Sequence, residues 1–148
     1  MKIYFASDHA GFEMKNALIE YVKELGYGTE DCGAYELNLE DDYPEFVKRA
    51  VQKVSKDPEN SKAIILGSSG QGEAMVANRF PNVRAVEYYG SNLEVIKLSR
   101  EHNDANILSL GARFLSLNDA ETAVKIWLET AFSGEERHTR RIKKIENL

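Results

Sequence analysis

A short apolar run followed at once by a glycine-rich segment limits most strongly what this chain can fold into. Residues 63–66 (AIIL) are predicted to form a buried strand, because short continuous apolar runs are typical of strands covered on both faces. Residues 67–73 (GSSGQGE) supply glycines and small hydroxyls, and residues 74–79 have a helical pattern. A strand, a tight turn and a helix in this order predict a parallel α/β sheet. The first backbone N–H groups of the helix would favour an anion.

The carboxylate of Glu73 stands in or just before the first turn of that helix. A helix N-terminus keeps such a carboxylate ionised, and a base beside an anion site suits proton chemistry on an anionic substrate. The alternative is an ordinary turn in which Glu73 only caps the helix. The loop by itself leaves both interpretations open.

Four further segments have the length and composition of strands, and helical patterns separate them. The expected strands are residues 2–6, 28–32, 63–66, 84–88 and 106–110. The expected helices run from Phe12 to Gly26, from Pro44 to Asp57, through 74–79, from Leu93 to Asp104, over 118–132 and over 137–145. We therefore expect a single domain over residues 1–148. It would be a Rossmann-like α/β fold with an open five-stranded parallel sheet, helices on both faces and a C-terminal basic helix.

The composition excludes several classes of protein. With 148 residues and a formal net charge of −5, the chain is not expected to bind nucleic acid or an anionic membrane. Cys32 is the only cysteine, and the three histidines lie far apart without zinc-ligand spacing, so no disulfide, metal or cofactor is expected. The N-terminus lacks the apolar core of a signal peptide, and no stretch is long enough to span a bilayer. These features predict a cytoplasmic protein.

Polar residues follow the first and the last expected strands. Asp8 and His9 come after the first strand, and Arg113 comes after the last. The carboxyl ends of parallel strands meet at one edge of a sheet, where ligands bind near a topological switch point. We expect these side chains to share that edge with the loop at 68–73. Asp8 and His9 could orient hydroxyls or move a proton, unless Asp8 merely caps the first helix.

Two further groups carry weaker signals. His102 and Asn103 close the fourth helix. The imidazole could act as an acid or a base and the amide could donate to an oxyanion, although a histidine at a helix C-terminus can be purely structural. Arg137 and Arg141 lie one turn apart on the last helix and, with Arg113, could hold a phosphate. The alternative is a solvated basic tail.

Together these motifs resemble the ribose-5-phosphate isomerase B family, which includes the galactose-6-phosphate isomerase subunits. The resemblance runs nearly end to end, and many motifs in the same order are far more specific than any single one. It is carried by residues 7–11 (SDHAG), 42–44 (DYP), 70–79 (GQGEAMVANR), 99–106 (SREHNDAN), 111–113 (GAR), and Arg137-His138 with Arg141.

The resemblance implies a metal-independent aldose–ketose isomerase that needs no cofactor. Such an enzyme moves a proton between C1 and C2 of a sugar phosphate through a cis-enediolate. It also implies a homodimer, or a dimer of dimers, in which two subunits share each active site. Nucleic acid and membranes would not be partners.

The resemblance further assigns roles to individual residues. Asp8 and His9 would contact the substrate, Tyr43 would line the pocket, and His102 would open the sugar ring beside Asn103. The backbone of Ser68, Ser69, Gly70, Gln71 and Gly72 would stabilise the enediolate. The phosphate would be held by Arg113, Arg137 and Arg141, with His138 among the substrate-binding residues.

Two positions depart from the pattern of the family. Many members carry a catalytic cysteine where this chain has Gly67, whereas one branch carries a glutamate at the position of Glu73. The residue pattern and the resemblance therefore select Glu73 as the base. Residues 87–89 (EYY) are unusual in charge and bulk and leave the identity of the sugar open.

Ribose 5-phosphate and ribulose 5-phosphate are the simplest substrate and product. A hexose 6-phosphate of the allose or galactose type is the close alternative. A non-catalytic sugar-phosphate sensor belongs to another class, but a sensor needs neither Glu73 nor His102. A flavodoxin-like flavin site would follow the first strand, and a receiver domain would carry an aspartate in place of Gly67.

Overall fold

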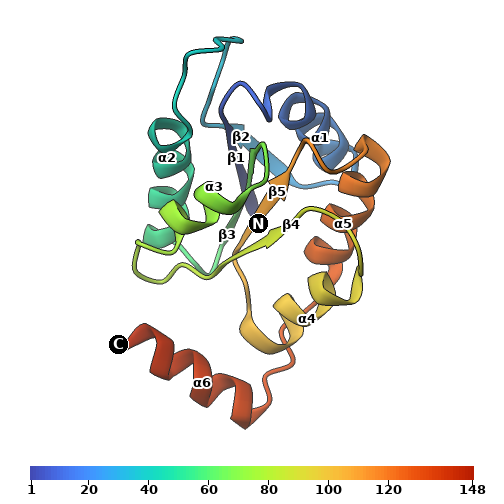
Figure 1. Cartoon of the computed structure of the whole chain (residues 1–148). Coiled ribbons are helices and arrows are strands. Elements are labelled where there is room, and N and C mark those ends of the chain that lie inside the picture. The colour runs from blue at the N-terminus through green and yellow to red at the C-terminus, as the bar shows by residue number, and fades with distance from the viewer.

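The five strands form one sheet in the computed structural model, which describes all residues 1–148 (Figure 1). The strands are β1 (Lys2–Ser7), β2 (Gly28–Asp31), β3 (Ser61–Gly67), β4 (Ala85–Tyr88) and β5 (Ile107–Gly111). All neighbours are parallel, and their order is β2-β1-β3-β5-β4. The predicted open five-stranded parallel sheet is confirmed.

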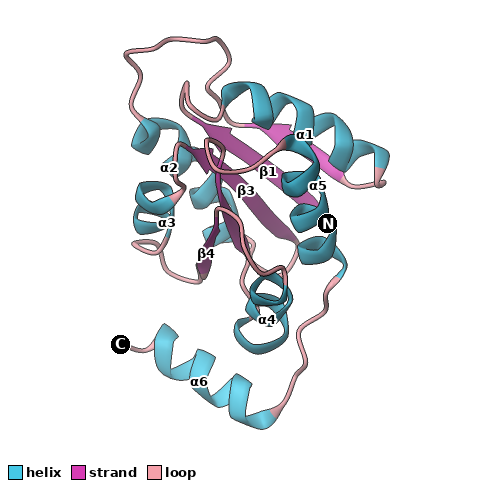
Figure 2. Cartoon of the chain, turned by 45° about the vertical axis from the view of Figure 1, so that its right-hand side comes forward, coloured by secondary structure: helices cyan, strands magenta, loops and turns pink.

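The helices form a layer on each face of the sheet (Figure 2). Their bounds are α1 (Phe12–Glu24), α2 (Tyr43–Lys56), α3 (Gln71–Ala77), α4 (Glu94–Asn103), α5 (Leu117–Glu129) and α6 (Glu136–Glu146). α1, α4 and α5 pack on one face and α2 and α3 on the other, so the prediction of helices on both faces is confirmed. None of the helices has the length and hydropathy needed to cross a bilayer.

The central strand β3 explains why its apolar run is unbroken. Side chains alternate between the two faces of a strand. Ile64 and Leu66 accordingly join the hydrophobic cluster under α1, α4 and α5, whereas Ala63 and Ile65 join the cluster under α2 and α3. All four residues are fully buried.

The topology places a switch point at the carboxyl ends of β1 and β3. These two strands are neighbours, but the chain leaves β1 toward the face covered by α1 and leaves β3 toward the face covered by α3. Ligands of open α/β sheets bind where consecutive connections diverge in this way. The segments that follow the two strands begin at Asp8 and at Ser68.

The predicted helix at 118–132 is too long at its C-terminal end. The helix α5 ends at Glu129, and Thr130 is extended, with φ −85° and ψ 120°. The carbonyl of Thr130 accepts a hydrogen bond from Arg100 Nε at 3.2 Å, and its hydroxyl donates to the Ile126 carbonyl at 2.6 Å. The buried Arg100 side chain thus binds the carbonyl of the extended residue at which α5 ends.

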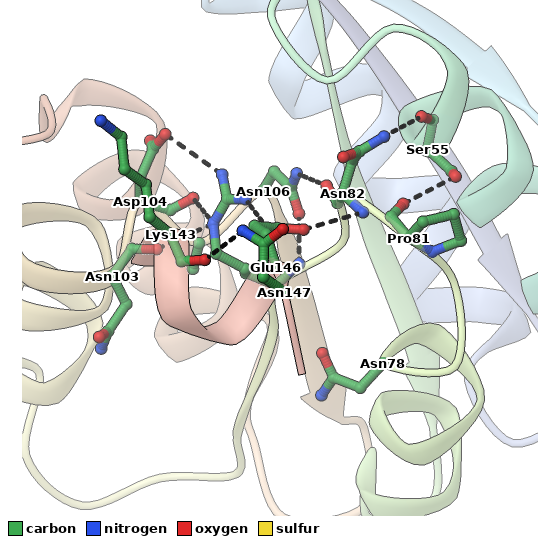
Figure 3. Close-up of polar contacts among 12 residues, drawn as sticks. Ser55, Asn78, Pro81, Asn82, Asn103, Asp104, Asn106, Lys143, Glu146 and Asn147 are labelled. Atoms are coloured by element: carbon green, nitrogen blue, oxygen red, sulfur yellow. Dashed lines mark hydrogen bonds and ion pairs between the residues drawn. The ribbon is translucent and has the colours of Figure 1, made fainter. Parts of the chain in front are cut away.

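The basic helix α6 lies outside the two layers and runs below the sheet (Figure 1). Near its C-terminal end, Glu146 accepts a hydrogen bond from Arg84 Nη1 at 2.6 Å and one from the Asn82 backbone N–H at 3.3 Å (Figure 3). Arg84 also pairs with Asp104 at 3.3 Å, just after α4. These contacts fix α6 beside the amino ends of β4 and β5.

Candidate functional site

Glu73 is the buried acid of the carboxyl edge. It lies in the first turn of α3, and only 4% of its surface is exposed. Burial is the main cause that raises its pKa above the ordinary value; its own backbone N–H opposes this, and nearby Asp8 adds to it. A carboxyl group with a raised pKa is a better proton acceptor at neutral pH than an exposed one.

Position 67 has no room for a side chain, because the Glu73 carboxylate occupies the space beside Gly67. A Cβ atom built on Gly67 would overlap the carboxylate of Glu73. A cysteine at position 67 and this orientation of Glu73 therefore exclude each other. The two residues form one structural unit.

Contacts with β5 hold the loop between β3 and α3 in place. Gly70 has φ 82°, a conformation that favours glycine. The buried hydroxyl of Ser109 donates to the Gly70 carbonyl at 2.6 Å. The backbone N–H of Arg113 donates to the Ser68 carbonyl at 3.1 Å. Ser68 and Ser69 are half-buried and Gln71 is exposed, so the loop faces outward from this support.

Asp8 lies at the end of β1 and is 7% exposed. Its Oδ1 atom accepts a hydrogen bond from the Ala10 backbone N–H at 2.9 Å. Burial raises its pKa. The alternative in which Asp8 caps α1 is wrong. Gly11 is the N-cap of α1, and the Asp8 side chain accepts its hydrogen bond from Ala10, which precedes the helix.

His9 is paired with Asp41, a residue that the sequence analysis did not single out. The distance from His9 Nδ1 to Asp41 Oδ1 is 2.7 Å. The ligand atoms of Asp8, His9 and Asp41 come within 4.8 Å of one another, a spacing that would also suit a cation. The direct His9–Asp41 contact and the nearby Arg113 guanidinium make an ion pair the better description.

The remaining side chains of this edge surround the loop. Tyr43 is the first residue of α2, and its hydroxyl lies where a Cβ on Gly72 would be. Arg113 is exposed after β5. At the end of β4, Tyr88 is buried in the core, whereas the half-exposed Tyr89 packs against Phe114 with ring centroids 5.9 Å apart.

A second group of predicted site residues gathers around α4 and α6. The rings of His102 and His138 stack with centroids 4.2 Å apart and planes 13° apart. His138 is buried, and desolvation lowers its pKa. Asn103 is exposed beside His102. Arg137 and Arg141 are exposed on α6, and Arg137 pairs with Glu135 at 2.8 Å.

One chain does not bring the two groups together. Glu73 lies beyond the carboxyl end of β3, whereas His102 closes α4 just before the chain enters the amino end of β5. The two residues therefore lie at opposite edges of the sheet. Arg113 belongs to the first edge, and Arg137 and Arg141 belong to the second.

The comparison with protein families gives one match over nearly the whole chain. Residues 3–145 match the family described as Ribose/Galactose Isomerase. Ribose-5-phosphate isomerase B of Mycobacterium leprae is 37% identical over 142 residues, which are 96% of this chain and 86% of that protein.

Solved structures of two relatives superpose closely on this chain. Ribose-5-phosphate isomerase B from Mycoplasma genitalium, solved with bound ribulose 5-phosphate, has a TM-score of 0.94 at 32% identity, covering 99% of this chain and 94% of that one. The Clostridium thermocellum ribose-5-phosphate isomerase B has a TM-score of 0.91 at 37% identity, covering 99% and 96%. At these identities, the similarity extends beyond the general α/β fold.

Proposed function

The chain belongs to the ribose/galactose isomerase family, and from that membership we infer that it interconverts ribose 5-phosphate and ribulose 5-phosphate. The observation that carries this inference is the end-to-end superposition on the relative that was solved with ribulose 5-phosphate. The reaction is an aldose–ketose isomerisation.

We propose that Glu73 is the base of this reaction. With the open-chain aldose bound, Glu73 takes the proton from C2, and the C–H electron pair forms the C1=C2 double bond of the enediolate while O1 becomes negative. Glu73 returns the proton to C1, and the hydroxyl on C2 gives up its proton to O1 as it becomes the ketone. The raised pKa of Glu73 and its place beside the 68–72 loop support this assignment.

The other residues of the first edge have roles in the same proposal. The backbone of residues 68–72 faces the enediolate oxygens, which need hydrogen-bond donors as their charge develops. Asp8 and His9 contact the substrate, and Tyr43 closes the pocket over Gly72. We assign the chain to the branch of the family that uses a glutamate, and the overlap that a side chain at position 67 would make with Glu73 supports this assignment.

The second edge completes the site in a second copy of the chain. His102 would open the sugar ring beside Asn103, and Arg137 and Arg141 would join Arg113 at the phosphate. These residues lie at the far edge of their own sheet, so a two-fold related copy is needed to bring them to Glu73. His138 stacks behind His102 and would support it. We therefore propose a homodimer, or a dimer of dimers, with shared sites.

The proposal is tested with purified protein and a panel of phosphorylated sugars. We expect turnover of ribose 5-phosphate to exceed that of allose 6-phosphate and galactose 6-phosphate. A preference for a hexose would make the exposed Tyr89 and Glu87 the residues to examine. Binding of all these sugars without turnover would overturn the assignment as an enzyme and favour a sensor. A cytoplasmic location is part of the proposal, because the single cysteine is a free thiol.

A further inference from the structure

Asp41 contacts the ring of His9, although it lies outside the residues that were predicted to form the site. We propose that Asp41 is a positioning residue, which holds His9 as an imidazolium with its Nε2–H presented to the substrate. The substrate atoms that such a group recognises are anionic or strongly accepting oxygens, the phosphate above all. This inference rests on the proposed function, since it concerns the same site.

The geometry fixes the ring through a single carboxylate oxygen. Asp41 Oδ1 accepts a hydrogen bond from the His9 backbone N–H at 3.0 Å and lies 2.7 Å from His9 Nδ1. These two contacts set both the position of the backbone and the rotation of the side chain. Because Nδ1 is engaged, the proton-bearing atom left for a ligand is Nε2, which has no hydrogen bond within the chain.

The carboxylate is buried more deeply than the ring that it holds. The Asp41 side chain is 7% exposed, compared with 26% for His9. The second oxygen, Oδ2, is buried and has no hydrogen-bond partner in the chain. A buried carboxylate with one partner interacts strongly with the charge of that partner, because little water screens it. His9 in turn has one side toward solvent, where a ligand can arrive.

The charges around His9 come from three segments. The hydrogen bond to Asp41 is the largest cause that raises the pKa of His9, and Asp8 adds to it, whereas Arg113 opposes it. The two carboxylates prevail, so His9 stays protonated to a higher pH than a free histidine. His9 and Arg113 then present two cationic groups at the carboxyl edge, which suits a phosphate dianion.

A purely structural role for Asp41 is the competing explanation. The loop before α2 carries three exposed apolar side chains, Tyr35, Leu37 and Leu39. The Asp41–His9 contact also ties this loop to the site, so Asp41 could act only as an anchor. An anchor needs a hydrogen-bond acceptor but no charge, and this difference separates the two roles.

The test replaces Asp41 with asparagine, which keeps the shape and an acceptor oxygen but removes the charge. Glu40→Gln is the matched control, because Glu40 is exposed in the same loop and its side chain makes no hydrogen bond. The chain has three histidines. The imidazole signals of ¹⁵N-histidine-labelled protein can therefore be titrated one by one and assigned with His9→Gln.

We expect Asp41→Asn to lower the pKa of His9. KM for ribose 5-phosphate at pH 7.5 should rise about tenfold while kcat changes about twofold or less, since a charged hydrogen bond becomes a weaker neutral one. The alkaline limb of kcat/KM should move to lower pH. Competitive inhibition by inorganic phosphate should weaken in parallel. Glu40→Gln should behave as the wild type in all four measurements.

Two outcomes would overturn the proposal. If the His9 titration in Asp41→Asn matches the wild type, Asp41 does not set the charge of His9. If the pKa falls but KM and phosphate inhibition do not change, the charge is not used for the ligand and Asp41 is only an anchor. The titration needs no activity, so a protein without isomerase activity would count against the proposed function and would still test the His9–Asp41 couple.

Discussion

The Glu73 side chain combines burial, a raised pKa and a glycine neighbour that leaves it room. In the folded chain its carboxyl holds a proton more tightly than in the unfolded chain, because burial penalises the charge. The free energy of unfolding is therefore lowered as pH rises from about the ordinary value of 4.5 through the raised value of the folded state. The proposed base thus costs the fold stability at neutral pH.

Glu73→Gln is expected to be slower and more stable than the wild type. Loss of a general base lowers kcat by roughly 10²–10⁴-fold, with substrate binding largely kept. The variant lacks a buried charge, so its melting temperature should exceed that of the wild type at pH 7, and the difference should shrink as pH falls toward 4.5. Steady-state kinetics and thermal melts at several pH values measure both effects. A variant with near-normal turnover would remove Glu73 from the mechanism.

Cys32 is expected to play no part in catalysis. It is 3% exposed, and burial raises the pKa of its thiol to about 11, so it is protonated and shielded at neutral pH. Iodoacetamide at pH 7.5 should label it only after unfolding, and the treated native protein should keep its activity. Mass spectrometry of the treated protein provides the measurement. Activity lost in proportion to labelling of the folded chain would contradict this expectation.

At the scale of elements, β5 supports the loop that precedes α3. The buried Ser109 hydroxyl holds the carbonyl of Gly70, the residue with positive φ that starts the helix. The loop backbone is therefore positioned by a neighbouring strand as well as by its own glycines. A stable position of this backbone matters because it faces the proposed enediolate.

Ser109→Ala is expected to lower both stability and kcat. The Gly70 carbonyl would be left without its partner, which costs about 1–3 kcal/mol for a buried group. Ser61→Ala is the control, because the buried Ser61 hydroxyl donates a similar bond of 2.6 Å to the Asp57 carbonyl at the amino end of β3. Both variants should melt at lower temperature, but only Ser109→Ala should lose kcat. Equal activity in the two would show that this bond does not tune the site.

At the scale of the whole molecule, the predicted site residues lie on opposite edges of one sheet, and the proposed dimer would join them as two halves of one site. Glu73 and Arg113 belong to the first half, and His102, Arg137 and Arg141 belong to the second. The contacts of α6 with Arg84 and with His102 keep the second half in place on its own chain. A two-fold axis would bring the first half of each chain to the second half of the other.

Complementation between two inactive variants tests the shared site. Glu73→Gln and His102→Asn are each expected to be nearly inactive. When they are unfolded and refolded together in equal amounts, about half of the dimers are mixed, and one site in each mixed dimer carries neither lesion. Activity should therefore return to roughly a quarter of the wild-type value. Size measurements must confirm mixed dimers, and a refolded mixture as inactive as its parents would place both residues in the same chain's site.

Much of the site could be predicted because strands and loops follow from local patterns. The apolar run at 63–66 and the glycines after it indicate a strand and a turn from their own chemistry. Parallel topology then places Asp8, Glu73 and Arg113 at one edge without further information. The role of Asp41 could not be predicted, because its contact with His9 joins residues 32 positions apart through a loop without a periodic pattern.

The sequence by itself determined the succession of strands and helices along the chain, the residues at the carboxyl edge of the sheet and the family. These follow from local periodicity, turn chemistry and motifs that need no knowledge of packing. Tertiary structure alone decided the overlap that ties Gly67 to Glu73, the end of α5 at Glu129 and the pairing of His9 with Asp41. Each of these depends on contacts between residues that are separated in the sequence. Burial and hydrogen bonding join residues that are far apart in the chain, whereas a sequence pattern describes only residues that are close together in it.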